Sequence, residues 1–455
     1  MVSNRLAELV VSIEAKDVKG DEKYRYLKQL IMDAIACAIA GTKGPFADEV
    51  TKLYSSLGTQ EQATAFGVEK KLSVSAAAVI NTFLARVYTF DDVYEPGVIH
   101  SGAPIIMTCF AFAEWLGSTI DDVFSSIIAG YEVACDTSYA INPNHYSAGF
   151  HPTGTCNAIG VAAAAAKMMK LNVEQTTLAL RLAADMACGF RQYQVDGSIV
   201  NSAFHGAKAA ENGIEAALLA KTGFADPGES ISGKFGIFNN TAGGYNKQLI
   251  FDNIGKHHRY MEVSLKPYPS CRYMHGAVDA VSRCISQNSI SLDNIKRITV
   301  KTFAMAKEEG DRKVLGSVLD AQFSVHYNVA AYLLNHGLSI SHFTPEAILN
   351  PAYPALAEKI YVEEDETLNS QYPEKWPYRA VIDTNDGHTY EYLSSYPPGS
   401  PENPILIEEL HKKWMLLMEP VIGNKKASEL IVKIADIQNL KKIEDIMKSL
   451  SNKVV

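Results

Sequence analysis

Apolar residues recur at helical spacing throughout the first half of the chain. Between positions 23 and 41, leucine, isoleucine and alanine fall every three or four residues, and Gly41 is a helix stop signal. Glycine and alanine repeat at the same spacing between positions 203 and 221. Because glycine destabilises an isolated helix, we expect a closely packed neighbouring helix there. The helices predicted in this part cover residues 5–18, 23–41, 46–57, 73–90, 104–115, 120–141, 157–171, 173–191 and 203–221.

The pattern changes near position 262, where alternation of apolar and polar residues replaces helical spacing. Two of the strands predicted there flank Asn385-Asp386-Gly387, a hairpin turn signal. Beyond a proline-rich stretch that starts at Pro397, helical spacing returns. The strands predicted in this half cover 297–302, 359–362, 378–384 and 388–392, and the helices cover 321–335, 405–418, 427–435 and 443–450.

These changes predict a mainly α protein with two domains, since 455 residues exceed what one hydrophobic core supports. We expect residues 1–262 to form the first part of a large all-helical domain. Residues 263–396 would form a smaller inserted α+β domain. Residues 397–455 would return to the helical domain, which is then built from both chain ends.

Composition narrows the class of protein. Hydrophobic residues make up 47% of the chain and charged residues 20%, as in ordinary globular proteins. A net charge of −9 argues against nucleic-acid binding, because no basic stripe is available to neutralise phosphates. The seven cysteines show no paired spacing, which favours free thiols in a reducing compartment. Neither a signal peptide nor a membrane-spanning run is evident, so we expect a cytoplasmic protein.

Common catalytic signatures are missing from the sequence. It has no glycine-rich phosphate loop, no HExxH, no CxxC pair and no GxSxG. We therefore expect no cofactor and no metal. Four polar clusters remain as candidates for a functional site.

The first cluster is Gly149-Phe150-His151-Pro152-Thr153-Gly154-Thr155, which places a histidine at the mouth of an alanine-rich helix. Thr153 and Thr155 are candidate caps for that helix. A titratable ring at a helix N-terminus suits an anionic substrate and proton transfer. A plain glycine- and proline-containing loop would show the same pattern.

The other three clusters supply acids, cations and further rings. Asp91 and Asp92 precede His100 in a loop that could equally be a solvated loop with an aspartate cap. The segment from Lys266 to Arg272 holds a lysine, a thiol and an arginine between prolines, and a domain linker would be its simpler interpretation. His326 and Tyr327 lie on different faces of one predicted helix, so at most one reaches a site. Together the four clusters suit proton removal beside a carboxylate that cations anchor.

At these clusters the sequence resembles the MmgE/PrpD family, which includes 2-methylcitrate dehydratases, cis-aconitate decarboxylases and an iminodisuccinate epimerase. The resemblance implies a large helical domain built from both chain ends, a smaller α+β lid and a homodimer. The segments that carry it, in family order, are Met32–Gly41, Phe90-Asp91-Asp92 with His100-Ser101-Gly102, Gly149–Thr155, His205–Ala210, Gly223-Phe224, Lys266–Arg272, Phe323-Ser324 with Tyr327, and Gly399–Pro404.

Family site residues carry over unevenly. The resemblance implies that His100, His151, Lys266 and Tyr327 line the pocket. At four pocket positions the sequence departs from the family. Thr89 stands where the family has an acid, and Val93 stands where it has a threonine. Ser202 replaces a lysine, and Cys271 replaces a histidine. The loss of a lysine removes a carboxylate anchor, which argues for a related but different, less charged acid substrate.

The main hypothesis is a cofactor-independent lyase that acts on a small di- or tricarboxylate or a related acid. His100 or His151 would transfer the proton, Asp92 and Tyr327 would orient or donate, and Lys266 would act on the carboxylate. Asp91 and Arg272 would bind substrate together with the departed positions Thr89, Ser202 and Cys271. An isomerase or epimerase would use the same proton abstraction, and a paralogue that only binds a ligand is the third possibility.

Overall fold

The computed structural model describes residues 1–18, 20–58, 60–252, 258–448 and 450, and these residues form two compact units. The first unit, here the helical unit, comprises Met1–Val87, Asp91–Leu265 and Ile407–Val455. The second, here the mixed unit, comprises Tyr88–Phe90 and Lys266–Leu406. The prediction of a mainly α fold is confirmed, because the described residues form 22 α-helices and a single four-stranded sheet. The role of the mixed unit as a lid stays a prediction.

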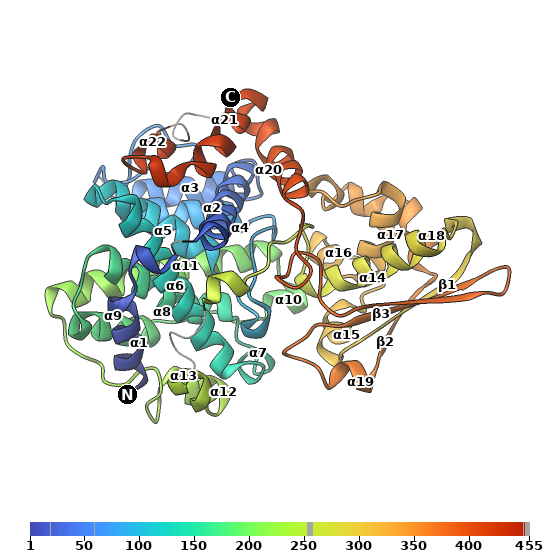
Figure 1. The fold of residues 1–455 in the computed structure, drawn as a ribbon, viewed down its shortest axis with the longest axis horizontal. Coiled ribbons are helices and arrows are strands. Elements are labelled where there is room, and N and C mark those ends of the chain that lie inside the picture. Colours follow the sequence, from blue (N-terminus) through green and yellow to red (C-terminus); the bar gives the residue numbers. More distant parts are fainter. Residues whose placement is uncertain (19, 59, 253–257, 449, 451–455) are drawn as a thin grey trace. The chain divides into compact units, whose positions relative to one another are not determined.

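Sixteen of these helices belong to the helical unit (Figure 1). Several match their predicted bounds closely, and the predicted helix 120–141 matches in full. The helices are α1 Val2–Ser12, α2 Asp21–Gly41, α3 Ala47–Ser56, α4 Val74–Arg86, α5 Gly102–Leu116, α6 Ile120–Ile141, α7 Asn144–Ser147, α8 Pro152–Met168, α9 Val173–Asp185, α10 Tyr193–Asp196, α11 Ile199–Thr222, α12 Ile237–Ala242, α13 Lys247–Asp252, α20 Ile407–Ile422, α21 Asn424–Ala435 and α22 Glu444–Met447. The last replaces the predicted helix 443–450, in which position 449 lies outside the described residues.

Close helix packing places α8 at the centre of the helical unit, against α6, α9 and α11 (Figure 1). A Cβ atom at Gly160 of α8 would lie 2.6 Å from Cβ of Ala134 in α6. One at Gly213 of α11 would lie 2.6 Å from the carbonyl oxygen of Ala158 in α8. The prediction that the small residues of 203–221 meet a close neighbour is therefore confirmed.

The two chain ends meet through a buried polar contact. Asp33 of α2 accepts hydrogen bonds from Lys413 Nζ at 2.9 Å and from Trp414 Nε1 at 3.0 Å, both in α20. Asp33 is 1% exposed, and burial raises the pKa of its carboxyl above the usual value. The segment that follows the proline-rich stretch thus packs on the first long helix of the chain.

The mixed unit contains the sheet, whose strand order is β2-β1-β3-β4. The pair β1/β2 is parallel, the other two pairs are antiparallel, and α14 packs against the sheet. The predicted hairpin is confirmed, with Gly387 at φ 89° in its turn. The elements are α14 Arg272–Asn288, β1 Ile295–Thr302, α15 Ala304–Gly310, α16 Val318–Gln322, α17 Val325–Asn335, α18 Ala352–Ala357, β2 Ile360–Glu364, α19 Glu366–Asn369, β3 Tyr378–Thr384 and β4 Thr389–Ser394.

Several predicted helix ends were wrong, and each has a local cause. The helix predicted to run to position 90 ends at Arg86, and Thr89 adopts a left-handed φ of 57°. The helix predicted over 321–335 breaks at Phe323, and Ser324 caps the new helix α17 by accepting from the Tyr327 amide at 3.1 Å. The helix predicted to run to 191 ends at Asp185, before Gly189 at φ 144°.

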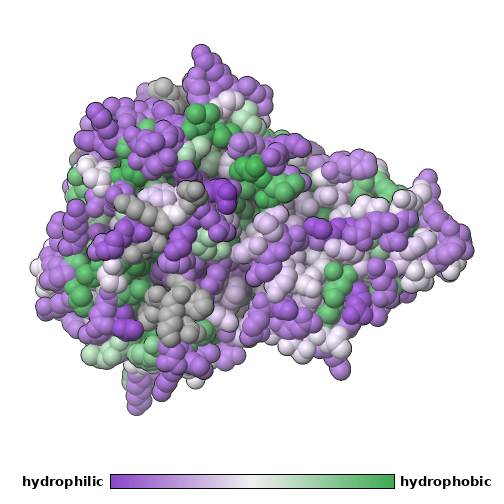
Figure 2. Space-filling model, viewed as in Figure 1, coloured by the Kyte–Doolittle hydropathy of each residue, from purple (hydrophilic) through white to green (hydrophobic). Residues whose placement is uncertain are grey.

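The face of the molecule drawn in Figure 2 is mostly polar. Figure 2 shows hydrophilic residues over most of the face in view, interrupted by separate hydrophobic patches. Among the described residues, no helix is both long and apolar enough to cross a membrane. Large apolar side chains exposed on the helical unit include Phe190, Val195 and Phe235.

Candidate active site

The ten predicted site residues divide equally between the two units. The helical unit holds Asp91, Asp92, His100, His151 and Ser202, and the mixed unit holds Thr89, Lys266, Cys271, Arg272 and Tyr327.

Asp92 anchors the loop that follows α4. Its carboxylate accepts from the Gly102 amide, the first residue of α5, at 3.0 Å and from the Tyr131 hydroxyl at 2.6 Å. Burial and the neighbouring Asp91 raise the pKa of Asp92 to about 7. Asp92 thus fixes the path of the loop, and near neutral pH both its protonated and its charged forms are populated.

His100 ends this loop with a defined tautomer. Its Nδ1 lies 2.6 Å from the Asp92 backbone carbonyl oxygen. Because a carbonyl only accepts, Nδ1 carries the hydrogen, and in the neutral ring Nε2 carries the lone pair. The first turns of α8 hold the His100 backbone, since its amide donates to Thr153 Oγ1 at 3.2 Å and its carbonyl accepts from Asn157 Nδ2 at 2.7 Å. A neutral imidazole of this tautomer is suited to act as a base through Nε2.

His151 begins α8. It occupies the N-cap position ahead of Pro152, so neither Thr153 nor Thr155 caps the helix as predicted. Proline at the first helical position explains the shift, because its ring already has a helical φ and lacks the N–H that a cap would satisfy. Thr155 Oγ1 donates instead to the His151 carbonyl at 3.3 Å, and the His151 amide donates to the Gly189 carbonyl at 3.1 Å.

The His151 ring pairs with a second histidine that the sequence predictions gave no role. Nδ1 of His151 lies 3.0 Å from Nδ1 of His205 in α11, and Tyr193 places its ring edge-on to both. His151 is 4% exposed, and burial lowers its pKa well below the usual histidine value. Burial and the charge of Arg86 lower the pKa of His205 to about 4. Both rings are therefore neutral at physiological pH.

Arg86, the last residue of α4, also has no role in the sequence predictions. Its side chain is 1% exposed, donates from Nη1 to the Asp91 carboxylate and donates from Nη2 to Ser202 Oγ at 3.2 Å. A Cβ at Gly206 would lie 2.5 Å from Arg86 Cδ, so any larger residue there would displace the Arg86 side chain. Nε of Arg86 and Oδ1 of Asp91 are buried without a hydrogen-bond partner. Orphaned polar atoms of this kind are expensive in a core and common at functional sites.

The cluster in the mixed unit begins with Lys266. Its ammonium group is fully buried and donates to the Thr89 backbone carbonyl at 2.9 Å. Cys271 is the N-cap of α14, and burial raises the pKa of its thiol to about 12, so the thiol is protonated at neutral pH. The structure thus places Thr89, Lys266 and Cys271 in one buried group.

Arg272 and Tyr327 bond to backbone carbonyls. The Arg272 guanidinium donates to Pro398 O at 2.6 Å and to Pro397 O at 3.3 Å. The Tyr327 hydroxyl donates to His342 O, and burial raises the pKa of this phenol. The neighbouring His326 pairs instead with Asp311, with Nε2 2.7 Å from Oδ1. The two adjacent side chains therefore have separate partners.

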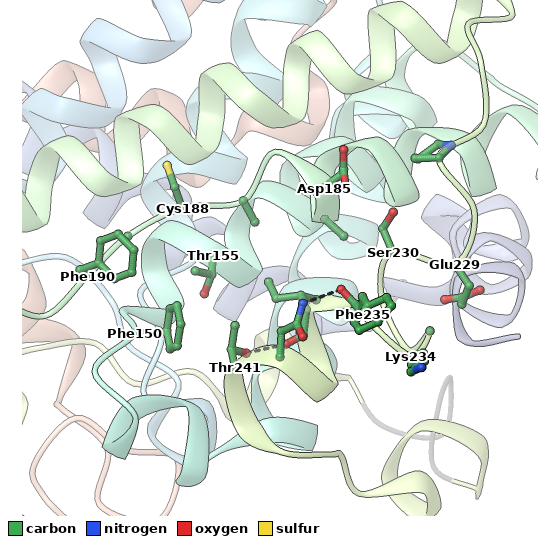
Figure 3. Close-up of a pocket in the computed structure, with 18 residues that line it drawn as sticks. Phe150, Thr155, Asp185, Cys188, Phe190, Glu229, Ser230, Lys234, Phe235 and Thr241 are labelled. Atoms are coloured by element: carbon green, nitrogen blue, oxygen red, sulfur yellow. Dashed lines mark hydrogen bonds between the residues drawn. The ribbon is translucent and has the colours of Figure 1, made fainter.

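A separate cavity of about 560 Å³ lies in the helical unit (Figure 3). Phe150 and Phe190 line it beside Thr155 and Cys188, while Ser230 and Thr241 lie across from them in the view. None of the ten predicted residues lines this cavity. Thr155, which lines this cavity, lies in the first turn of α8. His145 bridges two of the lining residues, because its Nε2 lies 2.8 Å from Thr155 Oγ1 and its Nδ1 lies 2.7 Å from Thr241 Oγ1.

Two candidate residues, Arg86 and His205, could not be assigned from spacing alone. His205 does lie in one of the segments that carry the family resemblance, which is the signal that could have marked it. Among the described residues, no group of three or more histidine, cysteine or acidic side chains could hold a metal ion.

Comparison with known families finds matches along most of the chain. The MmgE/PrpD N-terminal domain matches residues 4–250, and the MmgE/PrpD C-terminal domain matches residues 268–438. A cis-aconitate decarboxylase-like protein of Aspergillus oryzae, oryM, is 23% identical over 100% of this chain and 98% of its own length. The cis-aconitate decarboxylase of Aspergillus terreus is 24% identical over 99% of this chain and 96% of its own length. The human cis-aconitate decarboxylase is 24% identical over 92% of this chain and 87% of its own length.

Proposed function

Since this chain belongs to the MmgE/PrpD family of enzymes, we propose that it is a cofactor-independent lyase for a small di- or tricarboxylic acid or a related acid. The observation that carries the proposal is the buried histidine cluster of the helical unit. It contains His100, whose Nδ1 hydrogen points to the Asp92 carbonyl and leaves Nε2 as the nitrogen that can accept a proton, and a neutral His151 hydrogen-bonded to a second ring. The bare ring nitrogens of such groups can accept a proton from a substrate.

In a dehydration, one histidine would take a proton from the carbon next to a carboxylate. The C–H electron pair would form the double bond while the hydroxyl leaves with a proton as water. In a decarboxylation, the electron pair of the breaking C–C bond would return to the substrate carbon as CO₂ leaves. That carbon would take its proton from a histidine that has first been protonated by solvent. Either way His100 and His151 would supply and receive the proton, with Asp92 holding the loop that carries His100.

Carboxylate binding is proposed for cations of the mixed unit and for polar groups of both units. Lys266 would be the main anchor, because an ammonium group can exchange the Thr89 carbonyl for a carboxylate. Arg272 would contribute less, because its guanidinium already contacts two carbonyls and the His275 ring. Tyr327 would donate through its hydroxyl, Asp91 would act through Arg86, and Thr89, Ser202 and Cys271 would line the substrate with small polar groups.

A screen of carboxylic acids by mass spectrometry in D₂O tests the proposal. We expect loss of water or CO₂ from at least one acid, and no loss with the Lys266→Ala variant. Deuterium uptake into an intact acid with inverted configuration would instead show an epimerase. Binding of an acid without any change in its mass would show a paralogue that only binds a ligand.

We also propose that the protein is a cytoplasmic homodimer. All seven cysteines are unpaired, which supports a reducing compartment. Phe190, Val195 and Phe235 are 64%, 76% and 77% exposed on the helical unit, and a second copy would cover such side chains. Light scattering after size-exclusion chromatography would give twice the mass of one chain, and the mass of one chain would exclude the dimer.

A further inference from the structure

The His151–His205 contact constrains the protons of both rings. Two Nδ1 atoms 3.0 Å apart can share only one hydrogen, because one nitrogen must donate and the other must accept. When both rings are neutral, one is therefore the Nδ1–H tautomer and the other is the Nε2–H tautomer. Whichever ring donates its Nδ1 hydrogen has a bare Nε2 that can take another proton.

The position of His205 is fixed from two sides along α11. Ser202 lies one turn before it and binds the Arg86 guanidinium, while Gly206 follows it and makes room for the Arg86 side chain. Arg86 thus lies along the part of α11 that carries His205. From α8, Thr153 also reaches this place, with Cγ2 3.7 Å from where a Gly206 Cβ would lie.

Charged and titratable groups of several elements surround the two rings. Arg86 comes from α4 with its counter-ion Asp91, and His100 lies 3.8 Å from that carboxylate. Arg191 stacks on Tyr146 at 3.5 Å and adds positive charge, as does His145 of α7 when protonated. Tyr193 of α10 offers a ring edge to both histidines. Because burial and the surrounding positive charge both disfavour a charged ring, a proton added to the pair is held weakly.

We propose that His205 is a positioning residue that sets the tautomer of His151 and accepts its Nδ1 hydrogen during proton transfer. The inference rests on the proposed function. When the substrate C–H bond breaks, its proton goes to Nε2 of His151, and the electron pair stays on the substrate. The Nδ1 hydrogen of His151 then moves to Nδ1 of His205, which carries the positive charge. The reverse movement returns the proton, so no other reactant is consumed.

Nitrogen-15 NMR of the full chain with labelled histidines tests the pairing without substrate. At neutral pH we expect His151, assigned by single substitution, to be the Nδ1–H tautomer and His205 to be the Nε2–H tautomer, and the reverse assignment would overturn the proposal. Two Nε2–H tautomers would mean that no hydrogen lies between the Nδ1 atoms, and this result would overturn the proposal. Because no turnover is needed, the result stands even if no acid proves to be a substrate.

A double-mutant cycle tests the coupling during turnover. Asparagine at position 205 keeps a hydrogen-bonding group near the Nδ1 position but cannot hold a proton. We expect His205→Asn to lower kcat by a factor within roughly 10²–10⁴, with KM little changed, and to add no loss in the His151→Ala background. Wild-type kcat in His205→Asn, or losses that add in the double variant, would overturn the proposal. His336→Asn, on the surface of the mixed unit, is the matched control.

Discussion

Two buried arginines show how differently the two units use the same side chain. Arg86 of the helical unit and Arg272 of the mixed unit are 2% and 3% exposed. Arg86 donates to a carboxylate and a hydroxyl, and its charge lowers the pKa of two histidines. Arg272 donates to two backbone carbonyls of the proline-rich stretch. Both guanidiniums reach a titratable side chain, since Arg272 Nη1 also lies 3.3 Å from His275 Nδ1, but only Arg272 fastens the proline-rich segment.

The histidines follow the same division. His151 and His205 bond to each other, so a proton can move between them. His326 of the mixed unit faces Asp311 at 2.7 Å, a pairing that favours a fixed proton on Nε2. We infer that residues of the helical unit transfer the proton. The polar groups of the mixed unit mainly stabilise its fold and supply positive charge for carboxylate binding. Four variants test this division.

The largest effect is expected from His151→Ala. Loss of an acid–base group should lower turnover by roughly 10²–10⁴-fold. The free energy of unfolding should change far less than the activation free energy of the reaction. Turnover of the acid found in the screen measures it. The matching change in the mixed unit, His326→Ala, should lower stability more than turnover, and the opposite ranking would reverse the division.

Arg272→Met should reduce stability. Two buried carbonyls would lose their donor, which costs about 2–4 kcal/mol of unfolding free energy in total. Urea unfolding measures the loss. Arg297→Met is the control, because Arg297 is 43% exposed in its pair with Glu363 and should change stability by less than about 1 kcal/mol. A raised KM with unchanged stability would instead make Arg272 mainly a substrate anchor.

Arg86→Gln should shift the pH dependence of turnover. Removing the positive charge raises the pKa of His205 from about 4 toward the usual histidine value. The acid limb of the kcat profile should move upward by about one pH unit, which corresponds to about 1.4 kcal/mol. Ser202→Ala keeps the charge and loses one hydrogen bond, so its profile should stay in place. Equal profiles for Arg86→Gln and the wild type would remove Arg86 from the electrostatics of the site.

The smallest effect concerns His145, whose pKa burial lowers to about 3. A buried neutral histidine destabilises the folded state as pH falls, because below about pH 6.5 the unfolded chain binds a proton that the folded chain excludes. His145→Asn should therefore be less stable than the wild type near pH 7.5. The difference should shrink by about 1.4 kcal/mol near pH 5.5. Urea titrations at both pH values measure it, and a constant difference would contradict the expected sign.

Local patterns predicted most elements but not where several of them end. The apolar spacing of 120–141 and the alternation of 378–384 gave the bounds of α6 and β3, since burial of one face requires those periods. The end of α4 at Arg86 was not predicted, because the spacing of apolar residues continues beyond it. Its end coincides with the ion pair between Arg86 and Asp91, which no periodicity records.

The sequence by itself determined the mainly α fold, the hairpin and the family, because these depend on periodicity, turn chemistry and ordered segments along the chain. It also identified His100 and His151 as candidates. Only the tertiary structure decided their chemistry. His205 lies 54 positions from His151 and Ser202 lies 116 from Arg86, yet helix packing brings each pair within hydrogen-bonding distance. Tautomers, pKa shifts and ion pairs depend on such distances, so they arise only once the helices have packed.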